Sequence, residues 1–345
     1  MSVQQEPRPP TPGAPMTDSA RPRFLKRLRS HVAEEIMLVI LVMMCLVLSL
    51  FEPAFLSPLN LLNVLRIVSI TGIIAFGMTM VIISAEIDLS VGSAAAFCGC
   101  LLAVVIDRCD DLGVGPALGV PVAIAATLAA GFGIGAFTGL MRAKFTVPTF
   151  ITTLALLTGL RGAALLITGG FPVTSLPPWL TFLGGGNVLG VPFPTIVFVL
   201  VFLVVHFLMN FTVFGRSIYA VGGNAEAARL SGISVVRVRI LVMAITGLLS
   251  AVAGILLAAK IGSGTPTVAA GLELDVIAAV IIGGTSLFGG EGRVWGTLVG
   301  LVFIGVIVNG MTLLDVQADM QYVVRGALIL VAVLINQATI HRGRG

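Results

Sequence analysis

The sequence predicts an all-α polytopic membrane protein with about ten transmembrane helices and both termini in the cytoplasm. Apolar residues make up 57% of the 345 positions and charged residues only 10%, whereas about 25% charged residues is usual in soluble domains. Such a chain cannot cover a water-facing surface. Apolar runs of helix length recur along most of the sequence, and Lys and Arg gather in the gaps that one orientation places inside.

The N-terminal segment is polar and basic. Residues 1–20 are rich in Pro, Gln, Ser and Thr, which is typical of disorder, and six of the 20 Lys and Arg residues fall in the first 29 positions. A cleaved signal peptide is not expected, because the charged region is long and no small-residue cleavage site follows the first apolar run. We predict a disordered basic cytoplasmic tail over 1–34, a transmembrane domain over 35–337 and a short basic cytoplasmic tail over 338–345.

A membrane-spanning helix needs about 20 mainly apolar residues. The ten candidate segments are 35–51, 61–84, 89–106, 117–141, 148–168, 192–211, 239–260, 273–288, 294–314 and 320–337. The third and the eighth are the weakest, because they are short and contain glycine. The connections are brief, apart from a loop rich in Gly and Pro over 169–191 and a polar stretch described below.

The distribution of basic residues orients these spans. With the N-terminus in the cytoplasm, 15 of the 20 Lys and Arg residues lie on the inner side and five on the outer side. Acidic residues divide equally, eight and eight, as expected because they contribute little to orientation. The sequence therefore predicts ten spans with both termini inside.

The longest mainly polar stretch after residue 35 covers 215–239 and is called the polar segment below. Its interior, 224–232, has the pattern of a short helix with Asn224 as the N-cap and Gly232 as the C′ residue, and four arginines surround it. The predicted topology places it in the cytoplasm. A helix presented to a soluble cytoplasmic partner is one interpretation, and an amphipathic linker on the lipid surface is the other.

Two turns interrupt apolar runs in the two halves of the chain. The first turn, SAEIDLS over 84–90, carries Glu86 and Asp88, and the second turn is GGTSLFGGEGR over 283–293. Asp88 or Ser90 can cap the span that follows the first turn, or can contact a transported molecule. Interrupted segments in corresponding halves indicate a translocation pathway, while the glycines equally permit close helix packing.

Six charged residues lie at membrane depth in the outer half of this topology; they are Arg66, Arg161, Lys260, Glu273, Asp275 and Arg325. They either pair as structural locks or line an outward-facing vestibule. Glu273 and Asp275 are two positions apart, so on a helix they point about 200° apart. One of them can then face the bundle, toward Arg325 or Arg161. The candidate pathway or gate residues are Asp88, Ser90, Arg161, Glu273, Asp275 and Arg325.

The sequence contains no motif for catalysis or nucleotide binding. G-x-x-x-x-G-K-[ST] is absent, so the chain does not bind ATP by that route, and H-E-x-x-H and G-x-S-x-G are absent as well. The four cysteines lack metal-ligand spacing, and a net charge of +4 does not indicate nucleic acid. We expect no enzyme activity, cofactor or metal. Energy for transport would come from an ion gradient or from another subunit, and the polar segment favours another subunit.

Four stretches resemble the membrane permeases of bacterial ATP-binding-cassette (ABC) importers for monosaccharides, of the ribose, xylose and autoinducer-2 type. They are GMTMVIISAEIDLSVGS (77–93), GLRGAALLITGG (159–170), GRSIYAVGGNAEAARLSGI (215–233) and LELDVIAAVIIGGTSLFGGEGRVWGTLVG (272–300). The resemblance extends over about 36–337. At Ala85 and Glu86 the family more often has two small residues, so the resemblance assigns no role to Glu86.

The resemblance implies a bacterial inner-membrane permease that works as one of two permease chains, in a homodimer or heterodimer. It also implies a cytoplasmic ATP-binding subunit with two nucleotide-binding halves and a periplasmic sugar-binding protein. A short helix in the coupling loop, 212–238, would sit in a groove of the ATPase, where small side chains such as Ala228 allow close contact. The corresponding residues are Gly222, Asn224, Ala225, Glu226, Ala227, Ala228, Arg229, Ser231 and Gly232.

The alternative class is an ion-gradient-driven secondary transporter of a small polar solute. Such a transporter would need ionisable residues near the bilayer midplane. Here the ionisable residues lie near the ends of the predicted spans, which favours the ABC permease. The sequence does not specify the solute, and pentoses, hexoses and polyols remain open.

Overall fold

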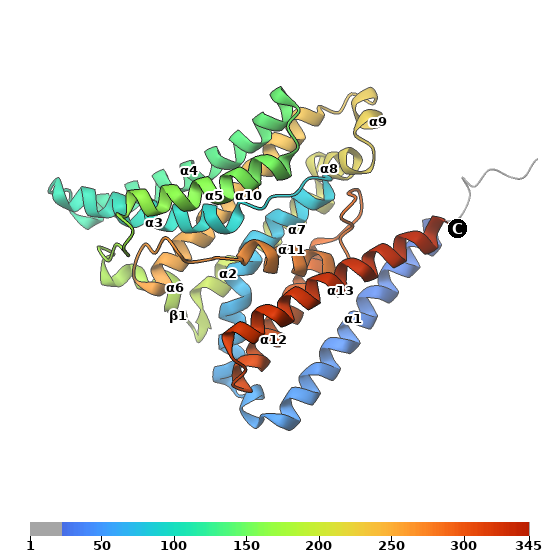
Figure 1. Cartoon of the computed structure of the whole chain (residues 1–345), viewed down its shortest axis with the longest axis horizontal. Helices are drawn as coiled ribbons and strands as arrows, with labels where there is room; N and C mark the ends of the chain where they lie inside the picture. The colour runs from blue at the N-terminus through green and yellow to red at the C-terminus, as the bar shows by residue number, and fades with distance from the viewer. Residues whose placement is uncertain (1–22, 345) are drawn as a thin grey trace, which may run out of the picture.

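The computed structural model describes residues 23–344, and helices make up most of it (Figure 1). The elements in chain order are α1 (Arg23–Phe51), η2 (Pro53–Leu56), α2 (Pro58–Ile83), α3 (Val91–Asp111), α4 (Pro116–Phe145), α5 (Thr149–Ile167), η3 (Pro178–Thr181), α6 (Phe182–Gly185), β1 (Asn187–Val188), β2 (Val191–Pro192), α7 (Phe193–Phe211), α8 (Val213–Gly223), α9 (Ala225–Leu230), α10 (Val235–Ile261), α11 (Leu272–Ile282), α12 (Val294–Leu313) and α13 (Ala318–Arg344).

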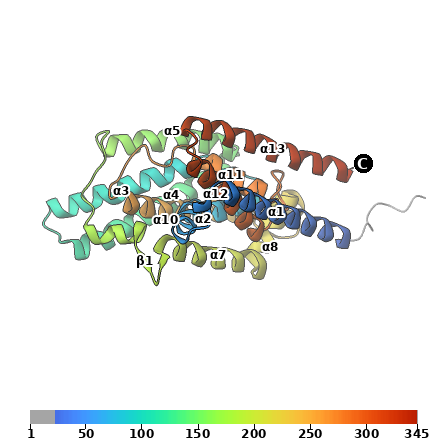
Figure 2. The same cartoon turned by 90° about the horizontal axis from the view of Figure 1, so that it is seen from below.

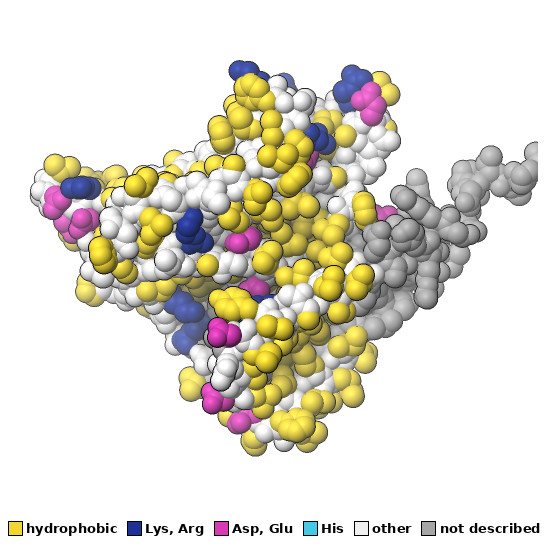
Figure 3. Space-filling model, viewed as in Figure 1, with side chains coloured by type: hydrophobic (Ala, Val, Ile, Leu, Met, Phe, Trp, Pro, Cys, Tyr) yellow, Lys and Arg dark blue, Asp and Glu magenta, His cyan; other side chains and the backbone are white. Residues whose placement is uncertain are grey.

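Seven of the described helices are long and apolar enough to cross a membrane, namely α2, α3, α4, α5, α7, α10 and α12. The part of α1 from Met37 to Phe51 is a shorter apolar helix. Hydrophobic side chains cover much of the face seen in Figure 3, and charged side chains are sparse on it. The chain is therefore an all-α, multi-pass membrane protein.

The centre of the molecule is α2, the most buried of these seven helices, which packs against α7, α10, α11 and α12. Helix α10 also contacts α3 and α4, and α5 packs on α3 (Figures 1 and 2). The least buried of the seven is α5, whose exposed side chains include Phe150 and Leu154. Such an apolar outer face is suited to lipid.

Glycines bring α4 and α10 into close contact. A Cβ on Gly131 would lie 2.5 Å from the carbonyl oxygen of Gly247, and a Cβ on Gly135 would lie 2.9 Å from Cα of Ala244. Both separations are shorter than real Cβ contacts, so larger residues would force the helices apart. Membrane helices use small residues in this way to bring their backbones together.

Two pairs of polar side chains join α2 to α12 in the core. Near the start of α2, Asn60 donates to Asn309 at 2.9 Å, and Asn309 donates back at 2.8 Å. Further along, the hydroxyl oxygens of Thr79 and Thr297 lie 2.7 Å apart. All four side chains are buried, so these bonds satisfy polar groups that would be costly to leave unpaired.

The length of the predicted eighth span, 273–288, is wrong. Helix α11 ends at Ile282 after 11 residues, which is about 16 Å of helix at about 1.5 Å per residue. An apolar bilayer core is about 30 Å thick, so α11 alone does not cross it. The helix stops because Gly283 is its C-cap and Gly284 adopts φ +85°, a backbone conformation that glycine adopts readily. The third span, in contrast, is longer than predicted, since α3 extends to Asp111.

The two terminal helices are longer than the sequence predicted. Helix α1 begins at Arg23, inside the segment 1–34 that was predicted to be disordered; residues 1–22 lie outside the described part. Helix α13 continues to Arg344, through most of the predicted tail 338–345. The added part of α1 is rich in Leu, Lys and Arg, which are good helix formers, so the helix extends into it. The start of α1 and the end of α13 lie on the same side of the molecule, at the right of Figures 1 and 2.

Candidate functional site

The polar segment folds mainly as α8 and α9. Helix α9 is preceded by its N-cap Asn224, whose side-chain Oδ1 accepts a hydrogen bond from the amide of Ala227 at 3.0 Å. It is closed by Gly232 at φ +85°, and the amides of Gly232 and Ile233 bond back to carbonyls in the last turn, both at 3.0 Å. The predicted short helix, with Asn224 as the N-cap and Gly232 as the C′ residue, is confirmed.

One side of α9 packs on its own chain and the other is exposed. Ala228 is 5% exposed and belongs to the main apolar core, whereas Leu230 is 75% exposed. Ala227 is exposed as well. The expectation that Ala228 enters a partner's groove is therefore corrected: its small side chain lets α9 lie close to the bundle. The face open to a partner carries Ala227 and Leu230.

Glu226 and Arg229 form an ion pair on the exposed side of α9. Arg229 donates from Nη2 to Oε1 of Glu226 at 2.6 Å and from Nε to Oε2 at 3.1 Å, as expected for residues three apart on a helix. The hydrogen bonds and the positive charge of Arg229 lower the pKa of the Glu226 carboxyl, so the pair is ionised at neutral pH. Because it is exposed, it contributes little stability and leaves a polar patch beside Leu230.

The end of α8 packs against both turns. The carbonyl oxygen of Ile83, the last residue of α2, accepts a hydrogen bond from the amide of Gly290 at 2.8 Å. Gly222 lies against the same carbonyl: a Cβ there would overlap the oxygen and lie 2.7 Å from the Gly290 nitrogen. Tyr219 donates its hydroxyl to the carbonyl of Gly292 at 3.0 Å. The polar segment therefore contacts the end of α2, which leads into the first turn, and the second turn together.

Asp88 and Ser90 stabilise the first turn. Ser90 occupies the N-cap position of α3, but its side chain makes no capping hydrogen bond. Asp88 Oδ1 instead accepts bonds from the amide and the hydroxyl of Ser90, at 2.8 and 2.7 Å, and both side chains are buried. Of the two residues expected to cap α3, Ser90 is therefore the N-cap, without a capping side-chain bond, and the Asp88 carboxylate bonds within the turn before the helix begins.

Glu86, to which the sequence assigned no role, lies in a buried charged cluster. Its side chain is 5% exposed, and Oε1 lies 3.2 Å from Nε of Arg142, near the end of α4, and 2.8 Å from Nε of Arg239, near the start of α10. Thr149, the first residue of α5, donates its hydroxyl to Oε2 at 2.6 Å. The nearest partner along the sequence is 56 positions away. The available signal was topological, since the predicted topology places all three charges at one side of the membrane.

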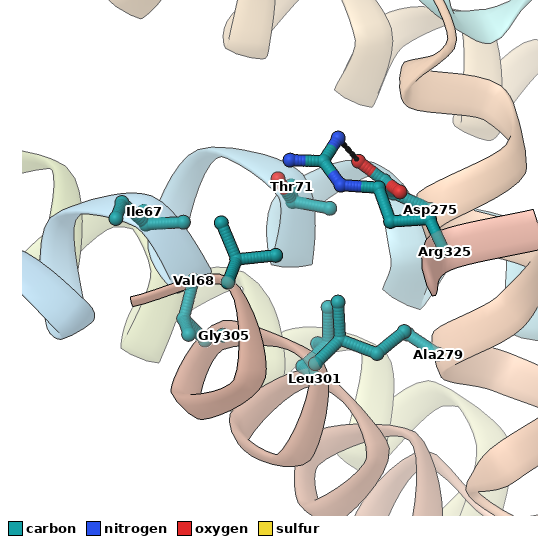
Figure 4. A pocket seen from close by; sticks show the side chains of 10 residues that line it. Ile67, Val68, Thr71, Asp275, Ala279, Leu301, Gly305 and Arg325 are labelled. Atoms are coloured by element: carbon teal, nitrogen blue, oxygen red, sulfur yellow. Dashed lines mark hydrogen bonds and ion pairs between the residues drawn. The ribbon is translucent and has the colours of Figure 1, made fainter. Parts of the chain in front are cut away.

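The charged residues predicted in the outer half of the membrane have different partners in the structure. Arg325 Nη1 lies 2.9 Å from Oδ2 of Asp275, which confirms one predicted pairing (Figure 4). Arg161 instead donates to two backbone carbonyls between α10 and α11, at 2.6 and 2.7 Å. Glu273 faces the start of α3, where a Cβ on Gly92 would overlap its carboxylate. The two acids of α11 therefore point to different neighbours, as their spacing predicted.

Asp275 and Arg325 border a small cavity between α2, α11, α12 and α13 (Figure 4). Its other lining residues are Ile67, Val68, Thr71, Ala279, Leu301, Ile304, Gly305 and Val308. The cavity measures about 50 Å³, whereas ligand pockets usually measure about 300–1,000 Å³. It has room for water beside the ion pair, but it does not hold a solute-sized chamber.

Sequence comparisons agree with this architecture. The family described as "Branched-chain amino acid transport system / permease component" matches residues 60–333. The "Ribose import permease protein RbsC" of Bacillus subtilis (strain 168) is 45% identical over 299 residues, covering 86% of this chain and 90% of that protein. The "L-arabinose ABC transporter permease protein AraH" of Azospirillum brasilense is 38% identical over 290 residues, covering 84% and 83%. No solved structure matches the chain.

The chain belongs to this family of transport-system permeases. It is the permease subunit of an ABC importer and not an enzyme, and a separate ATPase subunit hydrolyses the ATP. The family thereby decides between the two transport classes left open by the residues, in favour of the ATP-driven one.

Proposed function

We propose that this chain and a second permease chain form the pathway by which a monosaccharide or a related small polar solute crosses the bacterial inner membrane. A periplasmic binding protein delivers the solute, and a cytoplasmic ATPase with two nucleotide-binding halves drives its passage. The names of the relatives described above support the solute class, since they specify ribose and L-arabinose. The observation that carries the coupling mechanism is α9, a capped helix with one exposed face in a segment that packs against α2 and the second turn.

The proposed topology has ten spans with both termini in the cytoplasm. Seven helices supply seven spans, and α1 and α13 supply two more. Helix α11 together with the second turn supplies the remaining span, the eighth in chain order. The excess of basic residues on one side supports this orientation. The arrangement in Figure 1 also supports it, because the start of α1 and the end of α13 lie toward the side that carries α8 and α9.

The proposed coupling loop, 212–238, transmits movement of the ATPase to the bundle. Helix α9 has six residues, too few for stability in water without packing, so its shape depends on the caps at Asn224 and Gly232. Its face with Ala227 and Leu230 would contact the ATPase. Gly222 would pass the movement to the end of α2 and the second turn.

The outer charges are proposed to control access to the pathway. The Asp275–Arg325 pair holds α13 to α11 beside the cavity, so movement of either helix would open this region. Arg161 fixes the loop between α10 and α11, and Glu273 would respond to movement of α3. Asp88 and Ser90 would hold the first turn in shape at the other end of the bundle.

The test of coupling uses the complete complex of permease, ATPase and binding protein. Leu230→Asp places a charge on the exposed face of α9 and should abolish co-purification of the ATPase. Leu189→Asp is the matched control, because Leu189 is also exposed and apolar but lies on the β1–β2 hairpin; this variant should retain the ATPase. Retention of the ATPase by Leu230→Asp would contradict the proposed interface and favour a linker on the lipid surface.

The solute class and the topology need separate measurements. Proteoliposomes that contain the complex should accumulate at least one sugar from a mixture of radiolabelled D-ribose, L-arabinose and D-xylose, and uptake of none would contradict the proposed class. For topology, Ser231→Cys in a background without the four native cysteines should resist an impermeant thiol reagent in whole cells and react in inverted vesicles. Labelling in whole cells would contradict the proposed orientation and indicate the opposite one.

A further inference from the structure

The cluster around Glu86 joins more elements than any other ion pair described in the structure. The carboxylate accepts hydrogen bonds from Arg142 near the end of α4 and from Thr149 at the start of α5, and it forms an ion pair with Arg239 near the start of α10. Glu86 itself belongs to the first turn between α2 and α3. One side chain therefore holds together the ends of five helices. Without the carboxylate, these ends would lose their shared acceptor.

The charges of the cluster are unequal. Two guanidinium groups face one carboxylate, and both arginine side chains are mostly buried. Loss of the carboxylate charge would leave Arg142 and Arg239 as two like charges close together with little water to screen them. The ends of α4 and α10 would then repel each other, although glycines bring these helices into close contact along their length. Glu86 therefore decides whether the two ends stay together.

The cluster is linked to the polar segment by two short paths. Arg239 lies within the first turns of α10, which begins at Val235 just after α9. The first turn itself begins after Ile83, whose carbonyl contacts Gly222 at the end of α8. Ala85, next to Glu86, has φ +61°, an uncommon conformation for a residue with a side chain, so neighbouring contacts must hold this turn. Displacement of α8 and α9 would thus reach Glu86 from both sides.

We propose that Glu86 is a positioning residue for the coupling of ATP hydrolysis to transport. Its carboxylate fastens α4 and α10, through their arginines, to the turn between α2 and α3, so that the ends of these helices move together when α8 and α9 move. This inference rests on the proposed coupling role of α8 and α9. Without the carboxylate charge, the ATPase can still drive α9, but the helix ends no longer follow as one unit, and ATP is hydrolysed without import.

The main test is Glu86→Gln, which keeps the size of the side chain and an acceptor oxygen but removes the charge. The complete complex is reconstituted in proteoliposomes, and ATP hydrolysis and uptake of the three-pentose mixture are measured together. We expect the ATP hydrolysed per sugar imported to rise about fivefold or more. The matched control is Asp111→Asn, which removes the acid of an exposed ion pair, Arg108–Asp111, and should leave the ratio at the wild-type value.

A second variant separates coupling from simple stability. Glu86→Gln with Arg239→Gln removes one charge of each sign, so the repulsion between the arginines disappears and the thermal stability of the complex should return toward wild type. Coupling should remain lost, because the charged link from the first turn to α10 is still absent. Recovery of both stability and coupling would show a structural role only and overturn the inference, as would failure of both variants to assemble.

Two further outcomes are decisive. A wild-type ratio of ATP hydrolysed to sugar imported in Glu86→Gln would overturn the inference directly. Failure of the proposed function would look different, because the wild-type complex would then import none of the pentoses, or Leu230→Asp would keep the ATPase and full uptake. The same preparations therefore distinguish an error about Glu86 from an error about the coupling loop.

Discussion

Replacing Gly222 by alanine tests whether the contact between the polar segment and α2 transmits movement. A Cβ at this position would overlap the carbonyl oxygen of Ile83 and lie 2.7 Å from the amide nitrogen of Gly290. Real Cβ atoms essentially never approach another heavy atom to less than 3.0 Å. The end of α8 must therefore move away from α2, and the hydrogen bond between Gly290 and Ile83, 2.8 Å long, is strained or lost.

The expected cost follows from three effects. Overpacking of a tight site costs about 1–3 kcal/mol, and a lost hydrogen bond adds about 0.5–1.5 kcal/mol. Alanine favours helix over glycine by about 1 kcal/mol, which offsets part of this cost. The net weakening is about 0.5–3.5 kcal/mol. It corresponds to a roughly 2- to 400-fold lower equilibrium constant for formation of the contact between α8 and α2.

The assay compares Gly222→Ala with Gly223→Ala, the matched control at the next residue. A Cβ on Gly223 meets no atom within 4 Å, so this variant gains the same helix preference without the overlap. Both are purified as full complexes, and stimulation of ATP hydrolysis by the sugar-loaded binding protein is measured. Hydrogen exchange is followed in the peptide that contains Gly290. Gly222→Ala should lose most of the stimulation and show at least about twofold faster exchange, while Gly223→Ala should keep wild-type values. Equal behaviour of the two variants would refute the reasoning.

Three other predictions follow from contacts on α9 and α11. Ala228→Trp should lower the yield of folded permease because the site is buried, whereas Ala227→Trp should leave the yield unchanged and prevent ATPase pull-down; the reverse pattern would mean that the faces of α9 are misassigned. Asn224→Ala should lower the stability of α9 by about 1 kcal/mol, measured as roughly fivefold faster amide hydrogen exchange in α9. Unchanged exchange would show that the cap does not stabilise the helix. Arg325→Ala should lower the stability of the permease by about 2–3 kcal/mol. This is less than the about 3–5 kcal/mol of a fully buried pair, because the Arg325 and Asp275 side chains are 28% and 17% exposed. A double-mutant cycle with Asp275→Asn measures the interaction energy, and a value near zero would count against the pair.

The features of the polar segment could be predicted from the sequence because they depend on local bonds. The cap at Asn224 joins residues three positions apart, and the turn at Gly232 needs only a glycine in the left-handed region. The long apolar helices were predictable for a similar reason, since length and composition identify them. The division of α9 into a buried and an exposed face was not predicted, because it depends on how α9 folds against α8 and α10, which flank it in the chain.

Contacts between distant parts of the chain set the limit of prediction. The ion pair of Asp275 and Arg325 was anticipated among a few combinations, because both residues were placed at the same depth. The cluster at Glu86 was missed, since its charged partners come from helices whose relative positions no local pattern specifies. The short length of α11 was also missed: the apolar run continues to Phe288, but the paired glycines at 283 and 284 end the helix earlier.

The two bonded pairs between α2 and α12 have a mechanical consequence. Asn60 and Asn309 fasten the helices near one end, and Thr79 with Thr297 fastens them again further along. Two separated attachment points prevent one helix from sliding or pivoting on the other unless buried hydrogen bonds break. The two helices therefore act as a single strut through the middle of the molecule. During transport, the other helices must therefore move relative to this pair, or the pair must move as one rigid body. A cysteine cross-link between α2 and α12 should then leave transport intact throughout the cycle.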